Sequence, residues 1–129
     1  MNLPITSLFA AALAIILLAL TYHVIFARAK LGVSILHAGD MALATRIRRH
    51  GNFVETVPIA LIVMALAELG GANSTALYVA GVLLVLGRIA HPLGLDPEVS
   101  TKPLRIIGGV ATHLSIAICI VLIALQQFT

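Results

Sequence analysis

The chain has 129 residues, of which 60% are hydrophobic and only 10% are charged, whereas a soluble domain carries roughly 25% charged residues. This composition excludes an ordinary water-soluble fold, and the length leaves room for one domain of four membrane-crossing helices of about 20 residues each. The formal net charge of +3 does not indicate nucleic-acid binding, because the basic residues fall between apolar runs without interleaved aromatic side chains.

The first expected helix covers about residues 3–27 and carries no formal charge. At 1.5 Å per residue it is long enough for a hydrocarbon core of about 30 Å. Because no Lys or Arg precedes Arg28, the positively charged leader of a signal peptide is missing, and we expect a retained membrane helix. A polar segment from Arg28 to Gly51 follows and is the most basic stretch of the chain.

The second expected helix covers about residues 52–69, with a helical pattern that extends back toward Met41. Two glycines at 70–71 indicate its end, and the Asn-Ser pair at 73–74 is typical of a cap for the next helix. Further along the chain the expected elements are a third helix at 74–90, a polar loop from Pro92 to Pro103 and a fourth helix at 104–128. The sequence therefore predicts an all-α membrane protein, a single domain over residues 1–129 built as a four-transmembrane-helix bundle.

The distribution of positive charge predicts the orientation in the membrane. The basic residues lie in or beside the two long loops, and the turn at 70–74 and both termini contain none. Cytoplasmic loops carry an excess of Lys and Arg. We therefore expect the two long loops in the cytoplasm and both termini on the other side of the membrane.

Polar side chains gather at the expected cytoplasmic boundary. Arg48, Asn52 and Glu55 are spaced by four and three residues, which places them within about a 60° arc of one helix. Arg88 and His91 lie three apart on the third helix, and Arg105 opens the fourth. Such a cluster suits an anionic, peptide-like ligand, because Arg forks bind carboxylates and Glu accepts an ammonium group.

Two other interpretations of this cluster stay open. Arginines at the cytoplasmic ends of helices commonly serve topology or lipid headgroups, and Glu55 could be a structural partner of one of them. No compact group of His, Cys and acidic residues predicts a metal site.

Three segments, 48–58, 86–91 and 103–105, resemble motifs of the MAPEG family, the membrane-associated proteins of eicosanoid and glutathione metabolism. In this chain they are Arg-Arg-His-Gly-Asn-Phe-Val-Glu-Thr-Val-Pro, Leu-Gly-Arg-Ile-Ala-His and Pro-Leu-Arg. The resemblance extends from Ala27 to about Thr112 and keeps the order and approximate spacing of the three motifs. The forms look most like those of bacterial members.

The resemblance implies a homotrimer that binds glutathione, as a co-substrate, between neighbouring subunits near the cytoplasmic face. No heptad seam evident in the sequence predicts this trimer independently. By position, the implied glutathione ligands are Arg48, Asn52, Glu55, Arg88 and His91, with added charge from Arg28 or Lys30. Arg105 matches the arginine that is thought to stabilise the glutathione thiolate in the eukaryotic enzymes.

The chain departs from those enzymes at two positions. A tyrosine after the third-helix motif of several eicosanoid enzymes falls near Leu95, and a serine after the fourth-helix arginine falls at Ile106. We hypothesise a glutathione-dependent transferase or peroxidase that takes lipophilic electrophiles or lipid hydroperoxides from the bilayer. The alternatives are a non-catalytic protein that binds glutathione or lipid, and a small four-helix transporter. Transporters of that class tend to place their coupling acid in the first helix, and the first helix of this chain contains no acid.

Overall fold

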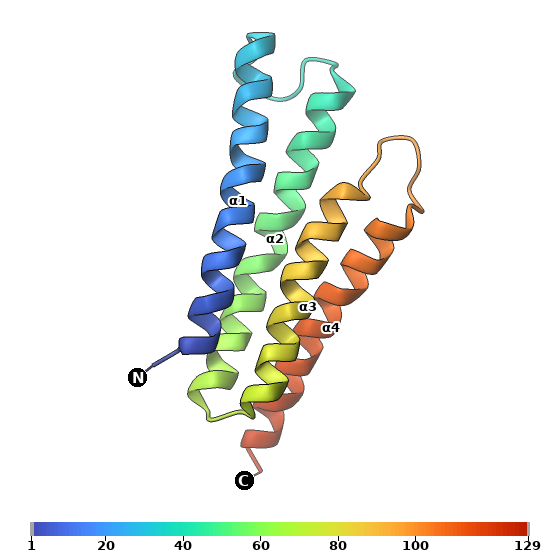
Figure 1. The fold of residues 1–129 in the computed structure, drawn as a ribbon. Coiled ribbons are helices and arrows are strands. Elements are labelled where there is room, and N and C mark those ends of the chain that lie inside the picture. The colour runs from blue at the N-terminus through green and yellow to red at the C-terminus, as the bar shows by residue number, and fades with distance from the viewer. Residues whose placement is uncertain (1, 129) are drawn as a thin grey trace.

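The computed structural model describes residues 2–128 and confirms an all-α bundle (Figure 1). Within that range the chain forms four helices and no strand, and all four helices are long and apolar enough to cross a membrane. They are α1 (Pro4–Leu31), α2 (Met41–Leu69), α3 (Ser74–Leu93) and α4 (Pro103–Gln126). The helices run up and down in turn, so that both termini and the α2–α3 turn lie at one end and the two longer connections at the other. We call the latter the loop end.

The sequence predicted the second helix at about residues 52–69 with a helical pattern extending back toward Met41, and in the structure α2 begins at Met41. Asp40 is the reason, because its Oδ1 accepts a hydrogen bond of 2.6 Å from the backbone N–H of Leu43 and so caps the helix. Most of the basic segment is therefore helix and not loop. At the other end, Asn73 caps α3 as expected, with its Oδ1 3.1 Å from the backbone nitrogen of Ala76.

The first turn of α1 is capped by a side chain from another helix. Its own N-cap residue, Leu3, makes no side-chain hydrogen bond. Instead, the carboxylate of Glu68 accepts from the backbone N–H groups of Ile5 at 2.8 Å and Thr6 at 2.7 Å. These donors have no partner inside the helix, so Glu68 ties the start of α1 to the end of α2.

Glycines let α3 and α4 approach closely. A Cβ atom on Gly108 would lie 2.5 Å from the backbone nitrogen of His91 and 2.8 Å from the carbonyl oxygen of Gly87. A side chain on Gly81 would collide with the ring of Phe9 on α1. Gly81 and Gly108 therefore lie at close helix contacts. Ser115 adds a bond between helices, since its Oγ donates to the carbonyl of Ala80 at 2.7 Å.

A row of large apolar side chains on α2 is about half exposed in the single chain. It comprises Ile59, Ile62, Leu66 and Leu69, which are 46–54% exposed. Successive members of the row are three, four and three residues apart. Toward the N-terminal end of α2 the alternation of four and three residues continues through Glu55, Asn52 and Arg48. This is the a and d spacing of a coiled-coil heptad. We call the four apolar residues the α2 seam.

Candidate functional site

A polar pocket of about 290 Å³ opens at the loop end, between α2 and the α3–α4 hairpin. We call it the loop-end pocket. Four residues that the sequence singled out line it: Arg48, Asn52, His91 and Arg105. The remaining lining residues are Met41, Ala44, Thr45, Leu95, Asp96 and Pro97. Residues far apart in the sequence therefore meet because α2, α3 and α4 all present their loop-end turns to one space.

On α2, the charge of Arg48 is partly balanced by Glu55. Arg48 Nη1 lies 2.9 Å from Glu55 Oε1, and the two side chains are 59% and 53% exposed. Glu55 does not line the pocket but borders it through this ion pair. An exposed pair of this kind contributes little to stability, so both groups remain free to exchange partners when a charged ligand binds.

Arg88 lies behind the pocket wall and not on its surface. Its residue is only 3% exposed, and its Nη1 donates to the backbone carbonyl of Asn52 at 3.3 Å and to Thr56 Oγ1 at 2.9 Å. The resemblance implied that Arg88 lines the glutathione site. In the structure Arg88 links α3 to α2 at Asn52, a residue that lines the pocket.

His91 and Arg105 are brought together by the packing of α3 against α4. Gly94 ends α3, and a Cβ atom there would collide with the backbone nitrogen of Arg105. Arg105 Nη1 donates weakly to the carbonyl of Ser100 at 3.3 Å. Its other guanidinium nitrogens have no hydrogen-bond partner among residues 2–128 and can reach a ligand.

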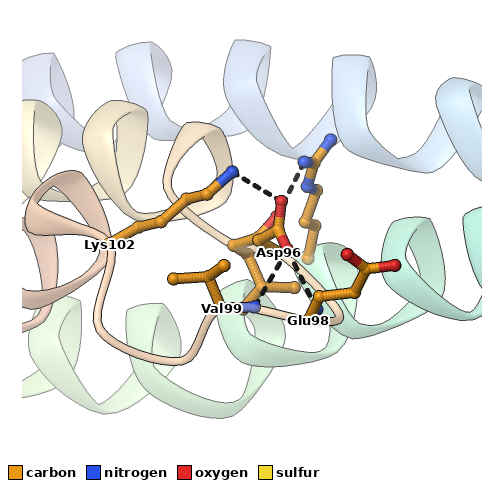
Figure 2. A network of polar contacts seen from close by, with 6 residues as sticks. Asp96, Glu98, Val99 and Lys102 are labelled. Carbon is orange, nitrogen blue, oxygen red and sulfur yellow. Dashed lines mark hydrogen bonds and ion pairs between the residues drawn. The ribbon is translucent and has the colours of Figure 1, made fainter.

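The α3–α4 loop is held by Asp96, which the sequence analysis did not single out. Figure 2 shows its carboxylate between Lys102 and the backbone of Glu98 and Val99. Lys102 Nζ lies 2.5 Å from Oδ2, and the two backbone N–H groups donate to Oδ1 at 2.9 and 3.0 Å. These donors lower the pKa of Asp96 from 3.8 to about 2, with the Lys102 bond as the largest cause. Although Asp96 lines the pocket, its negative charge is directed into the loop.

Arg28 and Lys30 lie apart from the loop-end pocket. Arg28 Nη1 donates to the carbonyl of Ser34 at 2.8 Å, and Lys30 lines a smaller cavity with Asp40 and Arg46. Within one chain, therefore, neither adds its charge to the pocket. No group of His, Cys, Asp and Glu within residues 2–128 is arranged to hold a metal ion.

A scan of known families matches the MAPEG family over residues 6–125, which is most of the chain. The chain belongs to the MAPEG family. It is similar to the inner membrane protein YecN of Escherichia coli K12, with 32% identity over 90 residues that cover 70% of this chain and 69% of that protein. YecN of Escherichia coli O6:H1 (strain CFT073) gives the same values. Together with its four apolar helices, this makes the chain an integral inner membrane protein.

In this MAPEG chain the residues that sequence reasoning missed are those that shape the pocket. Ala44, Thr45 and Pro97 line it without belonging to a motif of charged residues. The Asp-Pro pair at 96–97 is a turn signal, and together with Lys102 it could have indicated that the loop folds back on itself.

Proposed function

We propose that this MAPEG protein is a glutathione-dependent membrane transferase or peroxidase that acts on lipophilic electrophiles or lipid hydroperoxides. The observation that carries the proposal is the convergence of Arg48, Asn52, His91 and Arg105, from three helices, on one polar pocket at the loop end. The pocket volume of about 290 Å³ is close to the lower end of the usual range for ligand sites, about 300–1,000 Å³.

The donors around the pocket match the groups of glutathione. The guanidinium fork of Arg48 suits a carboxylate of glutathione, and that of Arg105 suits its sulfur. Glu55, at the pocket border, can accept the ammonium group, and Asn52 can both donate to and accept from a peptide bond. His91 adds a ring nitrogen on the α3 side.

Arg105 is the residue that we assign to the chemistry. A thiol with a pKa of about 8.5 is only a few per cent ionised at neutral pH, and an adjacent cation stabilises the thiolate. In conjugation, the thiolate forms a bond to the electrophilic carbon and the leaving group departs with its electron pair. In peroxide reduction, two glutathione molecules are oxidised to the disulfide while the hydroperoxide becomes an alcohol and water. The lipophilic substrate enters from the bilayer.

The proposal includes a homotrimer with the loop end in the cytoplasm. The α2 seam supports self-association, because Ile59 and Ile62 occupy neighbouring a and d positions, a choice that favours three or more strands over two. In an assembly, Arg28 and Lys30 would add charge to the pocket of a neighbouring subunit. The orientation is supported by the basic residues, which flank the loop end.

The test is to measure glutathione binding and the conjugation of chlorodinitrobenzene by the purified protein in nanodiscs. We expect saturable glutathione binding and turnover above the uncatalysed rate. Absence of binding would overturn the proposal. Tight binding without turnover of electrophiles or hydroperoxides would favour a non-catalytic protein that binds glutathione. The reason to test for this outcome is Leu95, which lines the pocket near the position where several eicosanoid enzymes have a tyrosine.

A further inference from the structure

A second cavity at the loop end lies beside the loop-end pocket but has a different set of charged residues. Its volume is about 360 Å³. It is lined by His23 from α1, by Met41, Ala42, Thr45, Arg46 and Arg49 from α2, and by Pro97 from the α3–α4 loop. None of the five residues that we assign to glutathione lines it, although Met41, Thr45 and Pro97 line both pockets. We call it the Arg46 pocket.

The Arg46 pocket concentrates positive charge without a carboxylate. Arg46, Arg49 and His23 line it, and no Asp or Glu does. The acids nearby are committed elsewhere: Asp40 caps α2, Asp96 pairs with Lys102, and Glu55 pairs with Arg48. Arg46 shares a smaller cavity with Asp40, but within residues 2–128 neither arginine of the Arg46 pocket has a carboxylate partner in an ion pair.

Arg49 in particular has a donor that nothing in the chain satisfies. Its Nη2 donates to the carbonyl of Leu95 at 2.9 Å, which fixes the side chain. Its Nε is buried and has no hydrogen-bond partner in the described part of the chain. A buried donor on a charged group is costly to leave unpaired, so the guanidinium of Arg49 is held in the pocket wall with incomplete hydrogen bonding.

The depth of the pocket matches the headgroup region of the membrane. Tyr22 and Phe26, on either side of His23 along α1, are 52% and 67% exposed and stack with ring centroids 5.8 Å apart. Exposed aromatic side chains near the end of a membrane helix mark the interface between hydrocarbon and water. The cationic groups of the pocket therefore face the level at which lipid phosphates lie.

We propose that the Arg46 pocket binds the phosphate group of an anionic phospholipid. Arginine forks bind phosphate oxygens in a bidentate manner, and basic pockets between membrane helices on the cytoplasmic side bind anionic headgroups. The acyl chains would lie along the exposed apolar surface of α1, and the stacked Tyr22 and Phe26 would border the glycerol. This lipid site is independent of the proposed glutathione chemistry.

The experiment is native mass spectrometry of the detergent-solubilised protein titrated with phosphatidylglycerol or phosphatidylcholine. We expect the wild-type protein to retain phosphatidylglycerol in preference to phosphatidylcholine. Arg46→Gln should weaken phosphatidylglycerol binding about five-fold, which corresponds to the ~1 kcal/mol contributed by one basic side chain near an anionic surface. Arg46→Lys should lose less, because it keeps the charge.

Arg28→Gln is the matched control, since it removes one positive charge at the same end of the bundle from a residue outside the pocket. It should leave phosphatidylglycerol binding within two-fold of wild type. Equal losses in Arg28→Gln and Arg46→Gln would overturn the site, because they would show binding by general surface charge. His23→Gln, which keeps the net charge at neutral pH, should also weaken binding, and it replaces Arg46→Gln if that variant does not fold.

Inorganic phosphate and glycerol phosphate distinguish a lipid from a soluble anion. We expect neither to compete with phosphatidylglycerol at equal concentration, because they lack the acyl chains that the α1 surface would hold. Competition at equal concentration would overturn the assignment to a lipid.

Discussion

At the scale of single residues, Asp96 has the clearest pH dependence. Its pKa lies at about 2, below the ordinary value of 3.8, chiefly because Lys102 donates to it. A lowered pKa in the folded state means that the carboxylate stabilises the loop at pH values above about 4 and loses this effect as the pH falls through about 2. A carboxyl-detected NMR titration of Asp96 should give a midpoint near 2. A midpoint near 3.8 would show that the contacts in Figure 2 do not persist in the membrane.

The residues of the loop-end pocket were partly predictable, and the reason differs for each. Arg48 and Asn52 follow from helical spacing alone, since residues four apart lie on one face. The approach of Arg105 to them depends on how α4 packs on α3, which no local pattern encodes. Arg88 is of a residue type that binds ligands, and its position in the motif implies that it lines the pocket. Its 3% exposure and its hydrogen bonds to Asn52 and Thr56 on α2 place it behind the pocket wall.

At the scale of helices, the close contact of α3 and α4 determines where His91 and Arg105 lie. Gly108→Ala would place a Cβ atom 2.5 Å from the backbone nitrogen of His91, and backbone atoms cannot move away cheaply. We expect the helices to separate, with a loss of about 1–3 kcal/mol in stability and about ten-fold weaker glutathione binding. Isothermal calorimetry and thermal melting measure these effects.

Gly109→Ala provides the matched control. A Cβ atom at Gly109 meets only the ring of His91, at the ordinary contact distance of 4.0 Å. This variant should melt and bind like the wild type. Similar losses in the two alanine variants would contradict the role of the Gly108 contact.

The start of α1 depends on a carboxylate from α2. Glu68→Ala should lower stability by about 1 kcal/mol, the usual cost of losing an N-terminal cap, and should speed amide hydrogen exchange at Ile5 and Thr6. Glutathione affinity should not change, because Glu68 lies at the end of the bundle opposite the pocket. Glu98→Ala, which also removes one acid, is the control. Unchanged exchange at Ile5 and Thr6 would contradict the cap.

The four membrane helices could be predicted from hydropathy and length, and the start of α3 at Ser74 from its cap signal, whereas the start of α2 was only partly predictable. The apolar run near Asn52 does not mark the start of α2, because this helix extends beyond the membrane core to Met41, as its helical pattern indicated. The Asp40 cap, three residues before Leu43, was the available signal. The cap of α1 by Glu68 had no sequence signal, since it joins residues 63 positions apart.

At the scale of the whole molecule, the α2 seam predicts how copies associate. We expect a mass in nanodiscs of three times the 13.5 kDa chain. Ile62→Trp should disturb this assembly, because a bulky ring at a d position does not fit the seam. Ile15→Trp on α1, at a residue 69% exposed, should leave it intact. A wild-type monomer or dimer, or equal effects of both substitutions, would contradict the trimer.

We expect Arg105 to convert bound glutathione into its thiolate, and a glutathione titration followed by thiolate ultraviolet absorbance tests this step. Wild-type protein should show saturable absorbance at neutral pH. Arg105→Ala should abolish it and slow conjugation 100- to 1000-fold, or about 2.7–4 kcal/mol by analogy with the loss of an oxyanion-hole donor, while Arg48, Asn52 and His91 retain much of the affinity. Arg105→Lys should recover part of the signal. Thiolate absorbance of wild-type size in Arg105→Ala would contradict the account.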